Sequence, residues 1–306
     1  QSKAHLSEVD IDLVSLDNTG AVVESIQVAE NTPDIGGYTW DIPTGGIDLA
    51  LDWRVRVTSQ QGGQPADLSA TLALAGAGNA YYINDGSTAD DVYTTAAGDN
   101  TFSGKTPDQP MASLAALLSL YDLGPGDTVY IDTGGYDLLT NIDLTGGDSG
   151  VTLRGAFDPG DPGNPAHVTM LDRGNRDDGN YVFELHNADD VTLEHLHLTG
   201  AEIAVHADRD SGSTGLTVRD SELFHNQTAG IHLRDDNHGL TVERSTFYGN
   251  LANGGNDDDN QDHGFESYDN DDVTIRDSSF STHHDWGVYL NRADDYLIEN
   301  NTFDGN

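Results

Sequence analysis

The chain has 306 residues, and its 53 acidic and 13 basic side chains give a formal net charge of -40 at pH 7. A surface of that sign repels nucleic acid phosphates and anionic lipid headgroups, so we expect no nucleic-acid partner. No run of about 18 apolar residues occurs, so no membrane insertion is expected. Cysteine is absent, so a zinc site would have to use histidine and carboxylate ligands alone. The acidity suits bound calcium or a saline environment, and the two explanations stay open.

Residues 9–74 contain short stretches in which apolar and polar residues alternate, separated by turn-forming segments. This period of two predicts β-strands, and we expect a small β-sandwich over 1–76. One predicted strand resembles the GxYxW strand of immunoglobulin-like modules in large secreted proteins, through Gly36, Tyr38, Trp40 and Pro43. The resemblance implies a spacer domain, because such sandwiches carry function only through grafted sites.

Residues 77–126 are expected to form a linker and an N-terminal capping segment. Apolar residues spaced by three and four predict a helix over 111–121. Pro110 precedes this helix and the Gly-Pro-Gly segment at 124–126 ends it. A buried strand is expected directly afterwards, from Asp127.

From residue 181 the chain repeats a short motif, with steps of 25, 24, 33 and 23 residues between copies. The copies are marked by tripeptides that begin at Val191, Leu216, Leu240, Val273 and Tyr296. The long step contains LANGGNDDDNQDH, of which roughly nine residues exceed the period. One coil per repeat, with one inserted loop, accounts for the spacing.

Aligning the repeats places apolar residues in three columns. The columns are Phe183, Val205, Ile231, Phe265 and Val288; Val191, Leu216, Leu240, Val273 and Tyr296; and Leu198, Leu223, Phe247, Phe280 and Phe303. Three inward columns predict three strands per coil, with equivalent residues about 4.8 Å apart in successive coils. A fourth column alternates in charge through Glu194, Arg219, Glu243, Arg276 and Glu299. It predicts a ladder of ion pairs between coils.

The segments GIHL…LTVERSTFYGN and GVYL…YLIENNTFDGN resemble the repeats of right-handed parallel β-helices of the pectate-lyase-like superfamily. The order of helix, PGDTVYI and G-x-Y resembles the entry of these coils. Over 110–306 the resemblance implies an all-β fold, with a right-handed single-stranded parallel β-helix of three strands per rung at 127–306. A small β-sandwich and a short capping helix precede it. The superfamily includes lyases, epimerases, hydrolases, adhesins and surface proteins, which implies an extracellular or cell-surface location.

Side chains suited to proton transfer gather on one predicted face. Two outward columns of the first strand in each repeat are Glu184, His206, His232, Glu266 and Tyr289, and His186, Asp208, Arg234, Tyr268 and Asn291. A surface without function would more often carry Thr, Ser, Asn and Lys. The inserted loop, which ends at Asp262 and His263, is expected beside this face.

The resemblance also implies roles, because lyases and C5-epimerases of this fold act on uronate polymers in such a groove. They neutralise the uronate carboxylate, remove the C5 proton and supply an acid. Here Arg234 or a calcium ion would neutralise, His232 would be the base, and Tyr268 or Tyr289 the proton donor. Substrate-binding residues would be Glu184, His206, Glu266 and His263. The sequence carries no groove lysine and no complete lyase signature, so non-catalytic glycan binding and a purely architectural role stay open.

A calcium site is expected in the inserted loop, where carboxylates stand close together at Asp257, Asp258, Asp259 and Asp262. The alternative is a solvated acidic loop, since the spacing of an EF-hand is missing. A second metal hypothesis joins His263 with either His283 or His284. Adjacent side chains in an extended chain point to opposite sides, so only one of the last two could contribute.

Two functions follow from these patterns. The first is a segment of a large secreted or cell-surface structural or adhesive protein, in a matrix, sheath or filament, whose partner is polysaccharide or copies of itself. The alternative is a calcium-assisted polysaccharide lyase or C5-epimerase. The last repeat lacks a cap, which predicts further chain or end-to-end stacking and favours the first function.

Overall fold

The computed structural model describes residues 8–16, 20–33, 53–60, 66–69, 80–249 and 261–306. The chain divides into two compact units, 1–76 and 77–306. Within the described ranges, no helix is both long and apolar enough to cross a membrane.

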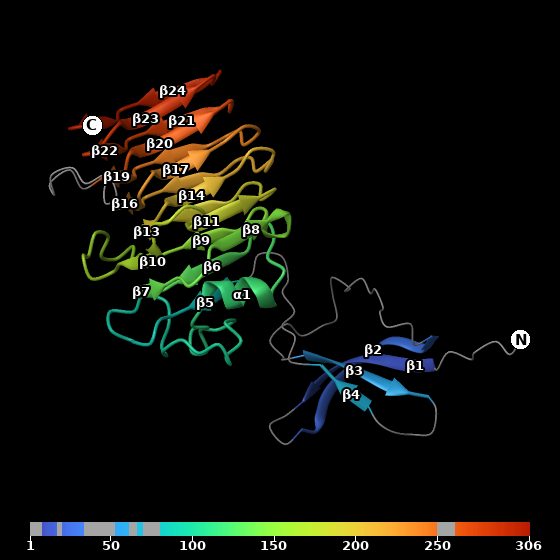
Figure 1. Ribbon diagram of the computed structural model, residues 1–306. Helices are drawn as coiled ribbons and strands as arrows, with labels where there is room; N and C mark the ends of the chain where they lie inside the picture. The colour runs from blue at the N-terminus through green and yellow to red at the C-terminus, as the bar shows by residue number, and fades with distance from the viewer. Residues whose placement is uncertain (1–7, 17–19, 34–52, 61–65, 70–79, 250–260) are drawn as a thin grey trace, which may run out of the picture. The chain divides into compact units, whose positions relative to one another are not determined.

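The described part of the first unit is a four-stranded antiparallel sheet in the order β2-β1-β3-β4 (Figure 1). Its strands are β1 (Glu8–Leu16), β2 (Val22–Pro33), β3 (Trp53–Ser59) and β4 (Ala66–Leu68). Leu13, Val14 and Trp53 are buried on it. The segment that resembles an immunoglobulin-like strand, residues 36–43, lies outside the described residues, so the sandwich stays a prediction.

The second unit is a parallel β-helix, in which three parallel sheets stack coil upon coil (Figure 1). An eight-stranded sheet contains β5 (Ala80–Ile83), β6 (Thr128–Ile131), β9 (Thr152–Arg154), β12 (Thr192–Glu194), β15 (Thr217–Arg219), β18 (Thr241–Glu243), β21 (Val273–Arg276) and β24 (Tyr296–Glu299). A seven-stranded sheet contains β7 (Gly134–Asp137), β10 (Thr169–Asn175), β13 (His197–Ala201), β16 (Glu222–Phe224), β19 (Thr246–Tyr248), β22 (Ser279–Ser281) and β25 (Thr302–Asp304). A six-stranded sheet contains β8 (Ile142–Thr145), β11 (Tyr181–His186), β14 (Ile203–Ala207), β17 (Ala229–Leu233), β20 (His263–Tyr268) and β23 (Trp286–Asn291).

The predicted apolar columns and their register are confirmed. Phe183 pairs with Val205, Val205 with Ile231, and Ile231 with Phe265 along the six-stranded sheet. All four side chains are completely buried. Three strands per coil, each contributing inward side chains, therefore build the continuous core between the sheets.

The entry of the coil differs from the prediction in two respects. The segment expected as a linker supplies β5, which pairs in parallel with β6 and so begins the β-helix. The helix α1 spans Leu114–Leu120 instead of 111–121, and the Ser113 side chain caps it by accepting from the Ala116 amide. Met111 cannot be helical, because it exchanges backbone hydrogen bonds with Tyr82 and Asn84 beside β5. A 3-10 turn, η1 (Gly146–Asp148), follows β8.

Polar ladders satisfy the backbone where the coil turns. Between the eight- and seven-stranded sheets, one residue per coil takes a left-handed conformation with φ between 46° and 56°: His195, Asp220, Arg244, Asp277 and Asn300. At the next position, three of these coils carry a buried serine, Ser221, Ser245 or Ser278. The Ser221 amide donates to the Ser245 hydroxyl and the Ser245 amide to the Ser278 hydroxyl. Stacking of this kind gives the buried amides at this turn their hydrogen-bond acceptors, as folded proteins require.

The charged column is aligned as predicted, with Arg219 paired to Glu194 and Glu243, and Arg276 to Glu243 and Glu299. Ion pairs form between Glu194 and Arg219 and between Glu243 and Arg276. The ladder also extends one coil earlier, where Arg154 binds Glu194. Glu243 takes a second partner, Arg244, at 2.9 Å.

Candidate functional site

The outward side of the six-stranded sheet carries three columns of side chains, which we call the sheet face. The columns are Tyr181, Ile203, Ala229, His263 and Trp286; Asp143, Glu184, His206, His232, Glu266 and Tyr289; and Thr145, His186, Asp208, Arg234, Tyr268 and Asn291. Each predicted catalytic and substrate-binding residue belongs to one of these columns. The structure therefore brings them onto one surface, at the spacing of neighbouring parallel strands.

The centre of the sheet face is the carboxylate of Glu266. Its Oε1 accepts a hydrogen bond of 2.5 Å from the Tyr268 hydroxyl. The Nε2 atoms of His232 and His263 each lie 3.9 Å from a Glu266 oxygen. The carboxylate thus accepts a direct hydrogen bond from the phenol, and one water molecule can connect it to each of the two imidazoles.

These groups are shielded from solvent although they lie on an outward face. Glu266 is 7% exposed and His206 6%. Tyr181 packs on His206 with ring centroids 4.3 Å apart, and His206 lies 5.3 Å from His232. Neither ring nitrogen of His232 hydrogen-bonds to any residue that the structure describes, and the same holds for Nδ1 of His206 and of His263. Buried polar atoms without partners are costly in folded proteins, so these nitrogens are candidates for contact with a bound molecule.

Burial sets the protonation of the imidazoles. It lowers the pKa of His206 to about 4, with the neighbouring His232 adding to the effect. Burial also lowers the pKa of His232, against the opposing influence of Glu266. The hydrogen bond to Glu266 raises the pKa of Tyr268 to about 12. At neutral pH the site therefore offers a neutral imidazole that can accept a proton and a phenol that can donate one.

The cation Arg234 and three aromatic rings, Tyr268, Tyr289 and Trp286, which we call the aromatic band, lie beside this centre. Arg234 Nη1 lies 3.5 Å from Asp208 Oδ1, with the two side chains 44% and 61% exposed. Such an exposed pair is weak, so the guanidinium can turn to another anion. Tyr289 lies between Tyr268 and Trp286, with ring centroids 5.7 and 6.2 Å away. Trp286 is 54% exposed.

The predicted calcium ligands Asp257, Asp258 and Asp259 lie outside the described residues, so the calcium site stays a prediction. The fourth ligand, Asp262, places Oδ1 3.5 Å from Nδ1 of His284, which also lies 3.3 Å from Asp285. His283 points inward and is completely buried. Of the adjacent histidines, only His284 can reach a carboxylate on the surface.

A cleft that the sequence did not predict lies on the other side of the coil. It has a volume of about 510 Å³ and is lined by residues that include Phe157, His167, His195, His197, Glu222 and Arg244. Phe157 stacks on His195 with centroids 4.2 Å apart, and burial lowers the pKa of both His195 and His197. The long segment between β9 and β10 forms one wall. Its length was the only sequence signal, because the segment precedes the regular repeats.

Comparison with known proteins agrees with this architecture. Residues 176–306 match the family described as "Right handed beta helix region", so this part of the chain is a right-handed parallel β-helix, as predicted. No curated protein sequence matches the chain.

Several solved structures are similar at low identity. A rhamnogalacturonan lyase is 14% identical with a TM-score of 0.39, over 74% of this chain and 62% of its own. An alginate lyase from Paenibacillus sp. str. FPU-7 is 15% identical with a TM-score of 0.38, over 58% of this chain and 70% of its own. The catalytic unit of a GH87 alpha-1,3-glucanase from Streptomyces thermodiastaticus strain HF3-3 is 13% identical with a TM-score of 0.39, over 96% of this chain and 57% of its own. The chain thus covers less than two thirds of the first and third of these proteins.

Proposed function

We propose that the sheet face binds an extracellular polysaccharide and that its centre removes a proton from a uronate residue, as a lyase or C5-epimerase does. The observation that carries this proposal is His232, a shielded imidazole with no hydrogen-bond partner among the described residues, beside the Glu266–Tyr268 pair. Perturbed, uncompensated titratable groups cluster at functional sites.

The proton acceptor and the proton donor of this centre suit a β-elimination. Neutral His232 takes the C5 proton, and the electron pair of the broken C–H bond forms the C4=C5 double bond. The C4–O bond breaks, and its oxygen receives the proton of Tyr268. Glu266 holds the Tyr268 hydroxyl in place. Arg234 would pair with the uronate carboxylate and stabilise the charge that develops there.

The negative charge of the protein predicts higher activity at high ionic strength. The chain carries a net charge of -40, so a polyuronate is repelled at long range. Salt shortens the Debye length from about 10 Å at 0.1 M to about 3 Å at 1 M, which leaves short-range contacts to decide binding. We therefore expect turnover to rise with ionic strength or with added calcium. Calcium in the inserted loop is part of this proposal and is tested by the same additions.

The test is incubation with alginate, pectate and other polyuronates, following the ultraviolet absorbance of the unsaturated product and the sugar stereochemistry by NMR. His232→Gln should abolish turnover. His197→Gln is a matched control, because His197 is also partly buried and lies 3.7 Å from a glutamate, Glu222, but on the seven-stranded sheet. Loss of turnover in His197→Gln with full activity in His232→Gln would move the chemistry to the other cleft and overturn the proposal.

The aromatic band supports a second candidate, glycan binding without turnover in a secreted or surface-attached structural protein. Exposed Trp286 beside Tyr289 offers apolar ring faces on which sugar rings can stack. Polysaccharide retention that Trp286→Ala weakens and His232→Gln leaves intact, without product or epimerisation, would establish this function. Self-association into a filament stays a prediction from the sequence, and sedimentation of the full chain tests it.

A further inference from the structure

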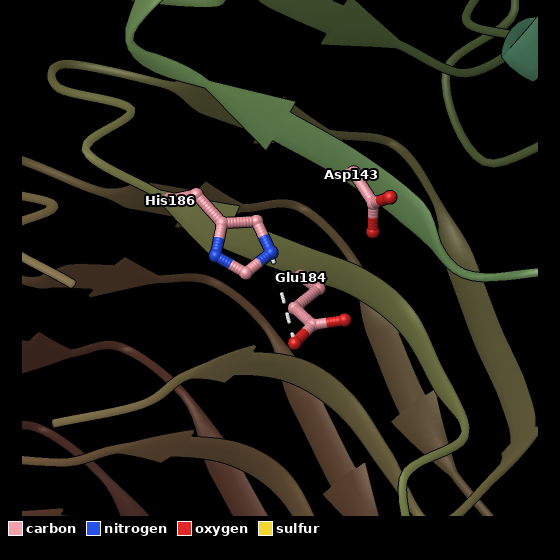
Figure 2. A group of neighbouring side chains, drawn as sticks. All are labelled: Asp143, Glu184 and His186. Carbon is pink, nitrogen blue, oxygen red and sulfur yellow. Dashed lines mark ion pairs between the residues drawn. The ribbon is translucent and has the colours of Figure 1, made fainter.

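A second cluster of ligand-type side chains lies at the opposite end of the sheet face. Asp143 stands on β8, and Glu184 and His186 stand on β11, where the strand ladder pairs Glu184 with Asp143. One ligand atom from each residue lies within 4.8 Å of the other two. Figure 2 shows the three side chains on neighbouring strands, with the imidazole of His186 turned toward Glu184. The His186 side chain is 46% exposed, so an ion from solvent can reach it.

Asn141 orients the Glu184 carboxylate through a hydrogen bond. Asn141 Nδ2 donates to Glu184 Oε2 at 2.9 Å. The Asn141 Oδ1 atom accepts from the Tyr181 amide at 3.0 Å and from Arg173 Nε at 3.3 Å. The other oxygen, Oε1, faces His186 Nε2 at 3.7 Å, too far for a hydrogen bond. Outer groups that orient a carboxylate in this way are typical of metal sites.

The charges of the cluster are not compensated by the protein. Asp143 and Glu184 are paired directly across two strands, and like charges in that position repel. Among the residues that the structure describes, neither carboxylate pairs with an arginine or lysine. Elsewhere on the coil, Glu194 and Glu243 each have arginine partners. A divalent cation would remove the repulsion at Asp143 and Glu184.

We propose that Asp143, Glu184 and His186 bind a divalent transition-metal ion such as zinc. An imidazole nitrogen with two carboxylate oxygens suits zinc, whereas calcium takes oxygen ligands only. Three protein ligands leave a position for a ligand from outside. Glu184 stands in the same column as His232, two strand spacings or about 10 Å away, so a bound ion would add positive charge to the sheet face. Metal binding itself does not depend on the proposed function.

The test is titration calorimetry of the full chain with zinc chloride in high NaCl, which screens non-specific binding to the acidic surface. We expect one strong site that His186→Ala weakens by at least about 100-fold, and Asp143→Asn likewise. Asn141→Ala should weaken it by about 10-fold, as removal of an orienting partner does. Circular dichroism checks that each variant folds.

The matched control is His284→Ala. His284 is 44% exposed and also lies beside two carboxylates, Asp262 and Asp285, but it is outside the cluster. It should leave the strong site unchanged. Equal zinc affinity in the wild type and His186→Ala, loss of the site in His284→Ala, or many equivalent weak sites would each overturn the proposal. Displacement of zinc by equimolar calcium would also overturn it, because an oxygen-only site would then be responsible.

Discussion

The Tyr268 hydroxyl donates a 2.5 Å hydrogen bond to the buried carboxylate of Glu266, two residues earlier on the same strand. This bond raises the pKa of Tyr268 to about 12. The phenol is therefore protonated throughout the neutral range, and its proton points at the Glu266 carboxylate. As a general acid, Tyr268 would turn this proton from Glu266 to the leaving oxygen by rotation about its C–O bond.

Tyr268→Phe should lower kcat on the polyuronate substrate by about 100- to 1,000-fold, with little change in binding, because general acid catalysis contributes on that order. Tyr248→Phe is the matched control. Tyr248 also has its pKa raised to about 12 and its hydroxyl lies 3.5 Å from a glutamate, Glu222, but it belongs to the seven-stranded sheet. Steady-state kinetics of the two variants separate the effects. Equal losses in both would contradict the assignment.

The pH dependence of kcat/KM should reflect the two groups. Burial lowers the pKa of His232 below the ordinary value of 6.5, so its neutral form persists at pH values below 6.5. The acid limb of the profile should therefore lie below pH 6.5. The alkaline limb should lie near 12, the pKa of Tyr268. Glu266→Gln removes the charge that holds the phenol proton, so the alkaline limb should move toward 10. An unmoved limb in that variant would separate Tyr268 from catalysis.

The repeats were predictable because two periods coincide. Apolar residues alternate within each strand, and each coil returns after about two dozen residues. A one-residue error in register would have turned Phe265 outward and Glu266 inward. The same alignment therefore fixed both the core and the sheet face, including His232 and Tyr268.

Features that depend on single contacts were not predictable. Asp143 precedes the regular repeats, so nothing in the spacing aligned it with Glu184. Met111 has a helical pattern but forms a parallel bridge with Ile83 of β5 and donates its amide to the Tyr82 carbonyl. Glu243 binds Arg244, its neighbour in the left-handed turn, as well as Arg276. Each of these outcomes is decided by individual side-chain and backbone contacts, which composition and period do not encode.

Buried His283 should make the protein sensitive to acid. Burial lowers its pKa to about 4 from an ordinary value of 6.5. Between these values the unfolded chain binds a proton that the folded chain does not, so the free energy of unfolding falls as pH decreases from 6.5 to 4. The slope for one such group is about 1.4 kcal/mol per pH unit.

Urea unfolding of the wild type and His283→Gln across this range checks the prediction. The difference in free energy of unfolding between the two proteins should be constant above pH 7 and should change by about 1.4 kcal/mol per unit below 6.5. Comparing two proteins cancels the titration of the many carboxylates they share. Parallel pH profiles would show that His283 titrates alike in both states.

Glu194 should be the member of the charged column that matters most for stability. Its side chain is only 3% exposed and binds both Arg154 and Arg219, whose side chains are 35% and 39% exposed. Glu194→Ala should lower the free energy of unfolding by about 2 kcal/mol, because it leaves two partly desolvated guanidinium groups without partners. Solvent around the arginines keeps the cost below that of a fully buried pair. Glu299→Ala, an exposed position of the same column, should change it by less than about 0.5 kcal/mol. Because the contacts of Glu194 are shielded, added NaCl should leave most of the difference in free energy of unfolding between the two variants intact. If both substitutions lower this free energy equally, the column aligns the coils without stabilising them.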